Sequence, residues 1–277
     1  MADPLALRSR FAPTPSGYLH AGNAVNFLIT DSLIATQGGS VMLRIDDLDV
    51  TRVRPEFIAD IFDSLAWLGL EWDEGPKNQE DLNQNWSQTK RTQHPLELAM
   101  ALRDAGHLFA CNCSRKQLAA CDCRSLSVHF DEPETTWRLK IPSSCSVNLK
   151  TWPHGQHRID LHAVMHDPVI RQRSGSPAYQ LASLADDVDF RMDLIVRGDD
   201  LRPSSACQMY IADLLGLEVF QNARFLHHPL ITDALGTKLS KSDGSSSLRA
   251  LRLDGKRPEK LRALANRVLA RSIIQGA

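Results

Sequence analysis

The stretch RFAPTPSGYLHAGNAVNF, residues 10–27, decides the fold of this chain. It places prolines, glycines, a His and an Asn within a few residues, just before an apolar run begins. A short strand, a stiff turn and a helix N-terminus together favour an anion, because free N–H groups and the helix dipole point at it. Gly17 and Gly22 allow close backbone approach, and His20 and Asn23 are placed to reach phosphate oxygens. A plain Pro-Gly loop with a capping Asn is the alternative for this stretch taken alone.

Bulk composition is that of a soluble globular enzyme, with 277 residues, 43% of them hydrophobic and 23% charged. The net charge of -1 excludes a global basic field for nucleic acid but leaves room for a local patch. Neither a signal peptide nor a segment of transmembrane length is evident. We therefore expect a cytoplasmic monomer without a membrane partner, in which the cysteines are reduced.

Strand and helix patterns alternate, stop in the middle of the chain, and then resume. Strands are expected at 7–14, 40–49 and 193–201, and helices at 22–39, 54–70, from 95, at 178–190 and at 204–217. From about 111 to 177 the pattern weakens to short strands, such as 136–141 and 157–167, with no long helix. This order predicts an α/β fold, a Rossmann-like doubly wound parallel sheet with an inserted α+β subdomain and a short helical tail. We expect catalytic halves at 1–105 and 178–277, and the insert at 106–177.

A second stretch, GTKLSKSDG at 236–244, carries two lysines on a glycine-flanked loop. Mobile lysines such as Lys238 and Lys241 suit a transient, highly charged state, although a plain exposed basic loop is the alternative. The two stretches together resemble, in order, the two signatures of class I aminoacyl-tRNA synthetases: LHAGN is similar to the HIGH signature and KLSKS to KMSKS.

Further blocks extend the resemblance. The segments RFAPTPSGYLHAGN, LRIDDLD, SPAYQLASLADD and LIVRGDDL are similar, in the same order, to the catalytic core of glutamyl-tRNA synthetases, over roughly 10–244. The resemblance implies activation of glutamate by ATP and Mg²⁺, and transfer of the glutamyl group to an RNA hydroxyl.

The resemblance also implies a glutamate pocket. Arg10 and Arg197 fall where the family binds the substrate carboxylates, and a guanidinium fork suits that task. Asp46 falls where the family usually has Glu beside the substrate ammonium, so the charge is kept on a shorter side chain. Three further positions line the pocket in the family: Ala12, Thr14 and Tyr179. The alternatives are a surface ion pair for each arginine and a buried core position for Tyr179.

For the ATP side, the substrate carboxylate needs no general base, because it is already an anion. Catalysis then consists of aligning the reactants and neutralising the charge on the phosphates. The resemblance assigns this role to a set of residues aided by Mg²⁺: His20, Gly22, Asn23, Lys238 and Lys241. Of these, Lys241 is expected to contribute most.

Four cysteines lie close together in CNCSRKQLAACDC, as Cys111, Cys113, Cys121 and Cys123. Two C-x-C pairs can surround one tetrahedral ion, and related proteins often place a structural zinc at the start of this insert, which is their acceptor-binding subdomain. The first pair matches the family spacing, whereas the second departs from it, which makes His129 an alternative ligand. Four reduced thiols without a metal are the other alternative.

The expected domain pattern lacks an anticodon-binding domain, and in this it resembles the stand-alone glutamyl-Q tRNA(Asp) synthetase family. That resemblance implies queuosine in the anticodon loop of tRNA(Asp) as the acceptor. A basic tail offers charge for phosphates or forms a helix that covers the sheet edge: Arg249, Arg252, Lys256, Arg257, Lys260, Arg262, Arg267 and Arg271. A ligase for another tRNA acceptor and a catalytically silent RNA-binding paralogue remain open.

Overall fold

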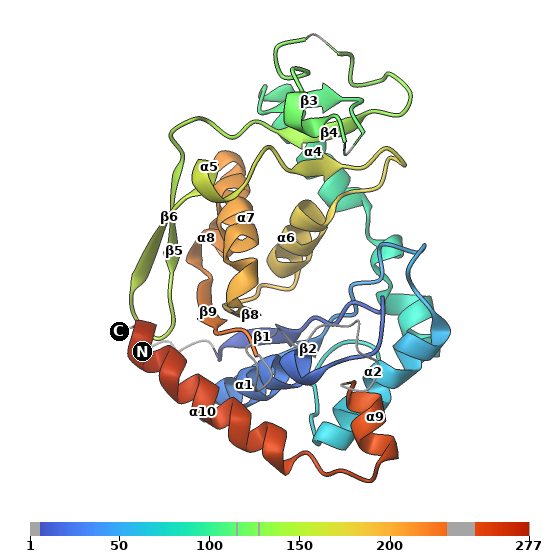
Figure 1. Ribbon diagram of the computed structural model, residues 1–277, viewed down its shortest axis with the longest axis vertical. Helices are drawn as coiled ribbons and strands as arrows, with labels where there is room; N and C mark the ends of the chain where they lie inside the picture. Colours follow the sequence, from blue (N-terminus) through green and yellow to red (C-terminus); the bar gives the residue numbers. More distant parts are fainter. Residues whose placement is uncertain (1–5, 115, 127, 232–246, 277) are drawn as a thin grey trace.

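The computed structural model describes residues 6–276 except 115, 127 and 232–246 (Figure 1). Its centre contains four strands: β1 (Arg8–Phe11), β2 (Ser40–Leu43), β8 (Leu194–Gly198) and β9 (Arg224–His228). Strand β1 is parallel to β2, and β8 is parallel to β9. The two pairs adjoin, because the Asp193 N–H donates to the Arg8 carbonyl at 2.9 Å and the Ser9 hydroxyl to the Leu194 carbonyl at 2.7 Å. The expected Rossmann-like α/β core is confirmed.

Helix α1 (Ala21–Gln37) follows β1, as the opening stretch predicts. It begins after His20 and ends at Gly38, whose φ of 62° lies in the left-handed region that glycine adopts without strain. The buried side of α1 packs against β1 and β8, while the C-terminal helix α10 (Glu259–Gly276) lies along it. The N-terminus of α1 therefore points at the ends of the parallel strands.

Helix α2 (Pro55–Leu68) confirms the next predicted helix. Short helical segments continue the chain from there: α3 (Gln79–Asp81), η1 (Leu82–Trp86) and η2 (Gln88–Lys90). A second group of helices covers the other face of the strands: α4 (Gln93–Asp104), α6 (Tyr179–Asp189), α7 (Arg202–Leu215) and α8 (Glu218–Asn222). They confirm the helices expected from 95, at 178–190 and at 204–217.

The middle of the chain contains short strands and short helices, as expected for an α+β segment. An antiparallel sheet joins β3 (Leu108–Cys111), β4 (Thr136–Leu139) and β7 (Val169–Arg171), and a hairpin joins β5 (Ser146–Lys150) to β6 (Gln156–Asp160). The helical pieces are η3 (Leu118–Ala120) and α5 (Leu161–Val164).

One detail of this segment differs from the sequence pattern, and a second could not be read from it. The strand expected over 157–167 ends at Asp160, whose side chain accepts the Ala163 N–H at 3.3 Å and starts α5 instead. The β5–β6 hairpin packs against α7, and its Val147 and Leu149 belong to the same hydrophobic core as that helix. The insert and the catalytic helices thus share one core.

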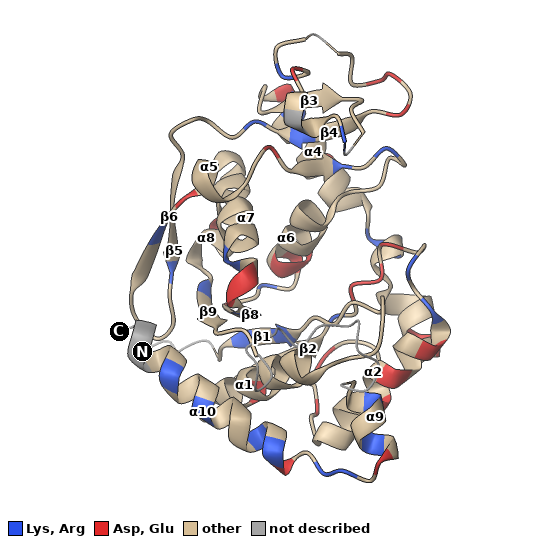
Figure 2. Cartoon of the chain, viewed as in Figure 1, with Lys and Arg blue, Asp and Glu red and all other residues tan. Residues whose placement is uncertain are grey.

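The basic tail forms α9 (Leu248–Leu253) and α10. Several of its cations are engaged by the rest of the chain. Arg252 pairs with Asp60 at 2.6 Å, Arg249 lies 4.7 Å from the centre of the Tyr18 ring, and Arg262 donates to a carbonyl of α2. Figure 2 shows the positions of the Lys and Arg residues along α10 and of the acidic residues on α2, beside α9.

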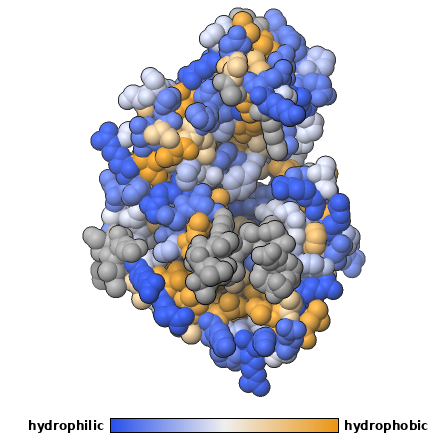
Figure 3. Space-filling model, viewed as in Figure 1, coloured by the Kyte–Doolittle hydropathy of each residue, from blue (hydrophilic) through white to orange (hydrophobic). Residues whose placement is uncertain are grey.

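Among the described residues, no helix has both the length and the apolar character needed to cross a bilayer. Hydrophilic side chains cover much of the face seen in Figure 3.

Candidate active site

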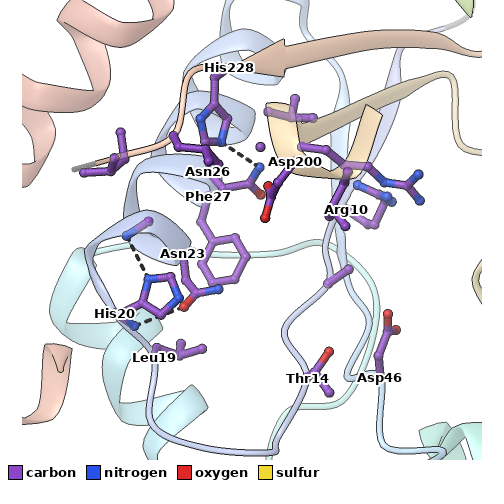
Figure 4. A pocket seen from close by; sticks show the side chains of 18 of the residues that line it. Arg10, Thr14, Leu19, His20, Asn23, Asn26, Phe27, Asp46, Asp200 and His228 are labelled. Atoms are coloured by element: carbon purple, nitrogen blue, oxygen red, sulfur yellow. Dashed lines mark hydrogen bonds between the residues drawn. The ribbon is translucent and has the colours of Figure 1, made fainter. Parts of the chain in front are cut away.

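A cavity of about 330 Å³ lies beside the N-terminus of α1, at the ends of β1 and β8 (Figure 4). The residues predicted to bind glutamate and ATP that the structure describes all line it: Arg10, Ala12, Thr14, His20, Gly22, Asn23, Asp46, Tyr179 and Arg197. The other two predicted residues, Lys238 and Lys241, lie outside the described residues. Segments that are far apart in the sequence thus meet in one place.

Three arginines of the cavity wall surround one buried carboxylate that lies behind them. Asp187 on α6 accepts from Arg10 Nε at 2.9 Å and from Arg44 Nη1 at 2.7 Å, and Arg197 Nη2 lies 3.5 Å from it. Asp187 is fully buried, and each arginine is at most 4% exposed. The surface ion pair considered for Arg10 and Arg197 is therefore wrong, since both guanidinium groups lie in the interior.

Arg197 is held by neutral partners as well. Its Nη1 donates to Gln208 Oε1 at 2.6 Å and to the Ser205 hydroxyl at 3.0 Å. These bonds orient the guanidinium in the cavity wall without neutralising it.

Asp46 lies on the opposite side of the same network. Its backbone N–H donates to the Pro13 carbonyl at 2.9 Å, which anchors the segment after β2 to the opening loop. Its carboxylate accepts from Arg44 Nε at 2.7 Å and from Gln88 Nε2 at 3.3 Å. The shorter side chain of Asp thus reaches the cavity wall while it is held by Arg44.

The pKa values of the two carboxyl groups shift in opposite directions. Burial would raise the pKa of Asp187, but the guanidinium groups of Arg10, Arg44 and Arg197 hold it below its ordinary value. Burial raises the pKa of Asp46, although Arg44 opposes the shift. Asp187 is therefore firmly ionised. A further cation near Asp46 would stabilise the ionised form of its carboxyl group.

The N-terminus of α1 forms the other end of the cavity. His20 Nδ1 accepts the Gly22 N–H at 3.1 Å, and Asn23 Oδ1 accepts the His20 N–H at 3.0 Å, so both side chains cap the helix. Since Nδ1 is an acceptor, the proton of a neutral His20 ring lies on Nε2. A Cβ at Gly22 would lie 2.9 Å from Cε1 of the ring, which explains the glycine. The capping role considered for Asn23 is real, and its amide N–H₂ remains a donor.

Tyr179 begins α6 and is 43% exposed at the mouth of the cavity. The alternative of a buried core tyrosine is therefore wrong.

Some polar residues of the cavity were missed by sequence reasoning: Asn26, Arg44, Asp200 and His228. His228 ends β9, and Asp200 follows β8, so both lie at the carboxyl ends of parallel strands, where ligands of α/β proteins bind. His228 Nδ1 lies 2.9 Å from the Pro229 carbonyl, and its Nε2 lies 3.3 Å from Asn26 Nδ2. Burial lowers the pKa of His228, so the ring is neutral with its proton on Nδ1. The sequence signal that could have identified His228 and Asp200 is their position at the carboxyl end of a strand.

The four predicted cysteines form a separate cluster at the start of the insert. The Sγ atoms of Cys111, Cys113, Cys121 and Cys123 all lie within 4.8 Å of one another. Two of these distances are 3.7 and 3.5 Å, and a tetrahedral zinc with bonds of about 2.3 Å places its sulfurs about 3.8 Å apart. His129 is not part of the group among the described residues. The geometry suits one ion held by both C-x-C pairs.

The surroundings of the cluster also fit a metal. Burial would raise the pKa of Cys111, but a backbone hydrogen bond from Cys113, the Cys121 thiol and Arg138 lower it. Arg138 Nε is buried without a hydrogen-bond partner among the described residues, and a metal-bound thiolate nearby would accept from it.

Strand ends, a helix N-terminus and converging arginines around one cavity define an α/β enzyme that binds an anionic, phosphate-bearing substrate. The comparison with known families makes the class specific. The model of the class I (E and Q) tRNA synthetase catalytic domain matches residues 6–272, and the chain belongs to this family of ligases.

Relatives share most of the chain. It is 32% identical over 274 residues to a glutamyl-Q tRNA(Asp) synthetase of Nitratidesulfovibrio vulgaris, covering 90% of this chain and 82% of the relative. A glutamyl-Q tRNA(Asp) synthetase of Pseudomonas fluorescens is 37% identical over 265 residues, covering 90% of this chain and 84% of its own length. A glutamate–tRNA ligase of Halorhodospira halophila is 33% identical, but the match covers 55% of its length and 93% of this chain.

The fold is shared with a solved glutamate–tRNA synthetase of Elizabethkingia anophelis, with a TM-score of 0.70 at 24% identity. The match covers 86% of this chain and 53% of that one, so the chain spans about half of the solved structure.

The buried Asp187 network yields a prediction for stability. Asp187→Asn keeps the shape but leaves three arginines without their carboxylate, and should lower the free energy of unfolding by about 3–5 kcal/mol at pH 7. Asp189→Asn, on the same helix, is the matched control. Its side chain is 41% exposed and pairs with His94, so it should cost under about 1 kcal/mol. Urea unfolding measures both, and similar values would contradict the role of the network.

The free energy of unfolding that Asp187 contributes should also depend on pH. The folded pKa of Asp187 is depressed, so its charge stabilises the fold fully above the unfolded pKa of about 3.9. This stability is lost as pH falls through the folded pKa. The difference between parent and Asp187→Asn should therefore shrink below about pH 4. A difference that stays constant to pH 2 would show that the charge of Asp187 is not its source.

Proposed function

We propose that this chain activates glutamate with ATP and transfers the glutamyl group to tRNA, with queuosine of tRNA(Asp) as the acceptor. The convergence of buried Arg10 and Arg197 beside Asp46 in one cavity, facing the N-terminus of α1, carries the proposal. The names of the relatives from Nitratidesulfovibrio vulgaris and Pseudomonas fluorescens support the same acceptor.

Charge balance favours glutamate over glutamine. The buried charged side chains at the cavity are Arg10, Arg44 and Arg197 against Asp46, with Asp187 behind them. Glutamate offers two carboxylates to the two guanidinium groups of Arg10 and Arg197, whereas glutamine offers only one. Arg10 and Arg197 bind the two carboxylates, and Asp46 accepts from the ammonium group.

The positions of the groups around the cavity account for the activation of glutamate. A glutamate carboxylate oxygen attacks the α-phosphorus of ATP, a carboxylate–phosphate bond forms, and the bond to the β-phosphate breaks with release of pyrophosphate. The N-terminus of α1, the His20 Nε2–H and the Asn23 amide donate to phosphate oxygens. Mg²⁺ bound to ATP would supply further neutralisation of the phosphate charge. Lys238 and Lys241 complete this set in the proposal.

The assignment of Arg197 is tested by Arg197→Leu. Loss of the guanidinium leaves a substrate carboxylate unpaired and should cost about 3 kcal/mol, on the order of a hundredfold in kcat/KM for glutamate. Glutamate-dependent exchange of pyrophosphate with ATP measures it. Arg202→Leu is the control, because Arg202 pairs with Asp199 outside the cavity. Parent-like kinetics in Arg197→Leu would remove this residue from the glutamate site.

The acceptor is tested with tRNA from cells that make queuosine and from cells that do not. Labelled glutamate should attach only to tRNA(Asp) that carries queuosine. Equal labelling of both preparations would favour a different tRNA acceptor. Absence of pyrophosphate exchange with an active preparation would favour a catalytically silent paralogue.

We also propose that the cysteine cluster holds one structural zinc. The purified protein should contain close to one zinc per chain, and replacing Cys111 and Cys113 together by Ser should release it. The insert should then loosen, and transfer to RNA should fall more than pyrophosphate exchange, because the cavity lies elsewhere. Cys145→Ala, outside the cluster, should keep the metal. Elemental analysis without zinc in fresh protein would refute the proposal.

A further inference from the structure

We propose that helix α9 holds the His20 turn, residues 15–20, in the geometry that receives the phosphates of ATP, with Tyr18 and Arg249 as positioning residues. The inference rests on the proposed activation of glutamate by ATP. Leu19 and His20 line the activation cavity, whereas Tyr18 and Arg249 are not among its lining residues. Tyr18 and Arg249 therefore act on a bound phosphate only through the backbone of the turn.

The backbone joins α9 to the His20 turn at the residues where the helix begins. The Leu248 N–H donates to the Leu19 carbonyl at 2.7 Å, and Ser247 forms an antiparallel β-bridge with His20. Leu19 and Leu248 are 1% and 0% exposed, and Ser247 is 9% exposed. Breaking a buried backbone pair of this kind is costly, because its polar groups have no water to bond with instead. The same residue that caps α1 thus also pairs with the start of α9.

The side chains of Tyr18 and Arg249 reinforce this junction. The Arg249 guanidinium lies 4.7 Å from the centre of the Tyr18 ring, and its Nη1 donates to the Tyr18 hydroxyl. The same ring meets Phe57 of α2 edge to face, with 5.0 Å between the ring centres and 85° between the planes. A cation over a ring and an edge-to-face ring pair are both favourable arrangements. The residue directly before Leu19 is therefore held from two helices.

Helix α9 is itself fixed to α2, which it adjoins in Figure 1. Arg252 Nη2 lies 2.6 Å from the carboxylate of Asp60, which is 3% exposed, and its Nη1 lies 3.3 Å from the carboxylate of Asp63. A buried carboxylate needs its cation, so α9 cannot leave α2 without leaving Asp60 unpaired. The His20 turn is thus attached to a fixed support and not to a loosely packed tail.

The geometry of the turn matters for ATP because its donors must be in place before the phosphates arrive. His20 and Asn23 cap α1 through hydrogen bonds of 3.1 and 3.0 Å, so a displaced turn would move the helix cap with it. Ordering a loose turn on binding costs affinity, and a small misplacement of aligned groups costs rate. The glutamate side is held separately, by the buried pairs of Asp187 with Arg10 and Arg197. Loosening the turn should therefore affect ATP and spare glutamate.

The test removes the contact from either side and from both: Tyr18→Leu, Arg249→Gln and the double variant. Arg103→Gln is the matched control for the arginine, because its guanidinium lies 5.3 Å from the centre of the Trp137 ring in another part of the chain. Tyr210→Leu is the control for the tyrosine, since it is half-buried on α7 and is not a lining residue of the cavity. Thermal unfolding establishes that each variant is folded.

Three quantities are measured: amide hydrogen exchange over residues 17–25, the Kd of ATP without glutamate, and the kinetics of pyrophosphate exchange. In each single variant of the contact, the amides of the turn should exchange about tenfold faster. The Kd of ATP should rise about three- to tenfold and kcat/KM for ATP should fall about ten- to a hundredfold, while KM for glutamate does not change. Tyr18→Phe keeps the ring under Arg249 and should retain most of the activity.

The double variant should lose no more than the more impaired single variant, because each single change removes the same contact. Additive losses would show that Tyr18 and Arg249 act independently, and would overturn the proposal. Parent-like amide exchange or parent-like kcat/KM for ATP in both single variants would overturn it, as would a rise in KM for glutamate that accompanies the loss for ATP. Pyrophosphate exchange that is absent from the parent would refute the proposed function, whereas amide exchange and ATP affinity would still decide whether α9 holds the turn.

Discussion

The arrangement of the active site depends on one fully buried carboxylate, that of Asp187, and the three guanidinium groups around it. A buried charge is tolerated only when it is paired and hydrogen-bonded, so these partners must keep their places. Arg10 comes from β1, Arg44 follows β2, and Arg197 lies on β8, while Asp187 lies on α6. The network therefore joins the two halves of the catalytic core across the insert and sets the position of the arginines that face the cavity.

A neighbouring part of the network extends this constraint to the segment before α4. Asp186 accepts from Arg91 at 2.7 Å and from Gln88 at 2.7 Å, and Gln88 in turn donates to Asp46. The acid expected to bind the substrate ammonium is thus held through the same helix that holds the arginines. A substitution in α6 should alter the positions of charged side chains on both sides of the cavity, because buried ion pairs of this kind do not relax independently.

The sites proposed for this protein lie at two different ends of the molecule. The activation cavity lies at the parallel strands, whereas the cysteine cluster lies at the β3–β4 end (Figure 1). The β5–β6 hairpin connects these ends, since the Trp152 N–H donates to the Phe225 carbonyl of β9 at 2.9 Å and the hairpin packs on α7. In the tail, by contrast, Arg249, Arg252 and Arg262 are engaged by their own chain, which supports the alternative of a covering helix for that segment.

Local sequence patterns were sufficient to predict much of this structure. The helix after the opening stretch, its glycine stop and the strand–helix order follow from periodicity and capping, which act within a few residues. The cysteine pairs were likewise evident from their spacing. The sequence motifs also named Arg10, Asp46 and Arg197, but their partners were decided only by tertiary structure. Asp187 lies 177 residues from Arg10, and Asn26 lies 202 residues from His228. The short helix α5 and the shared core of the insert were also set by packing. Buried polar groups take the partners that long-range packing brings near them, and no local propensity records which those are.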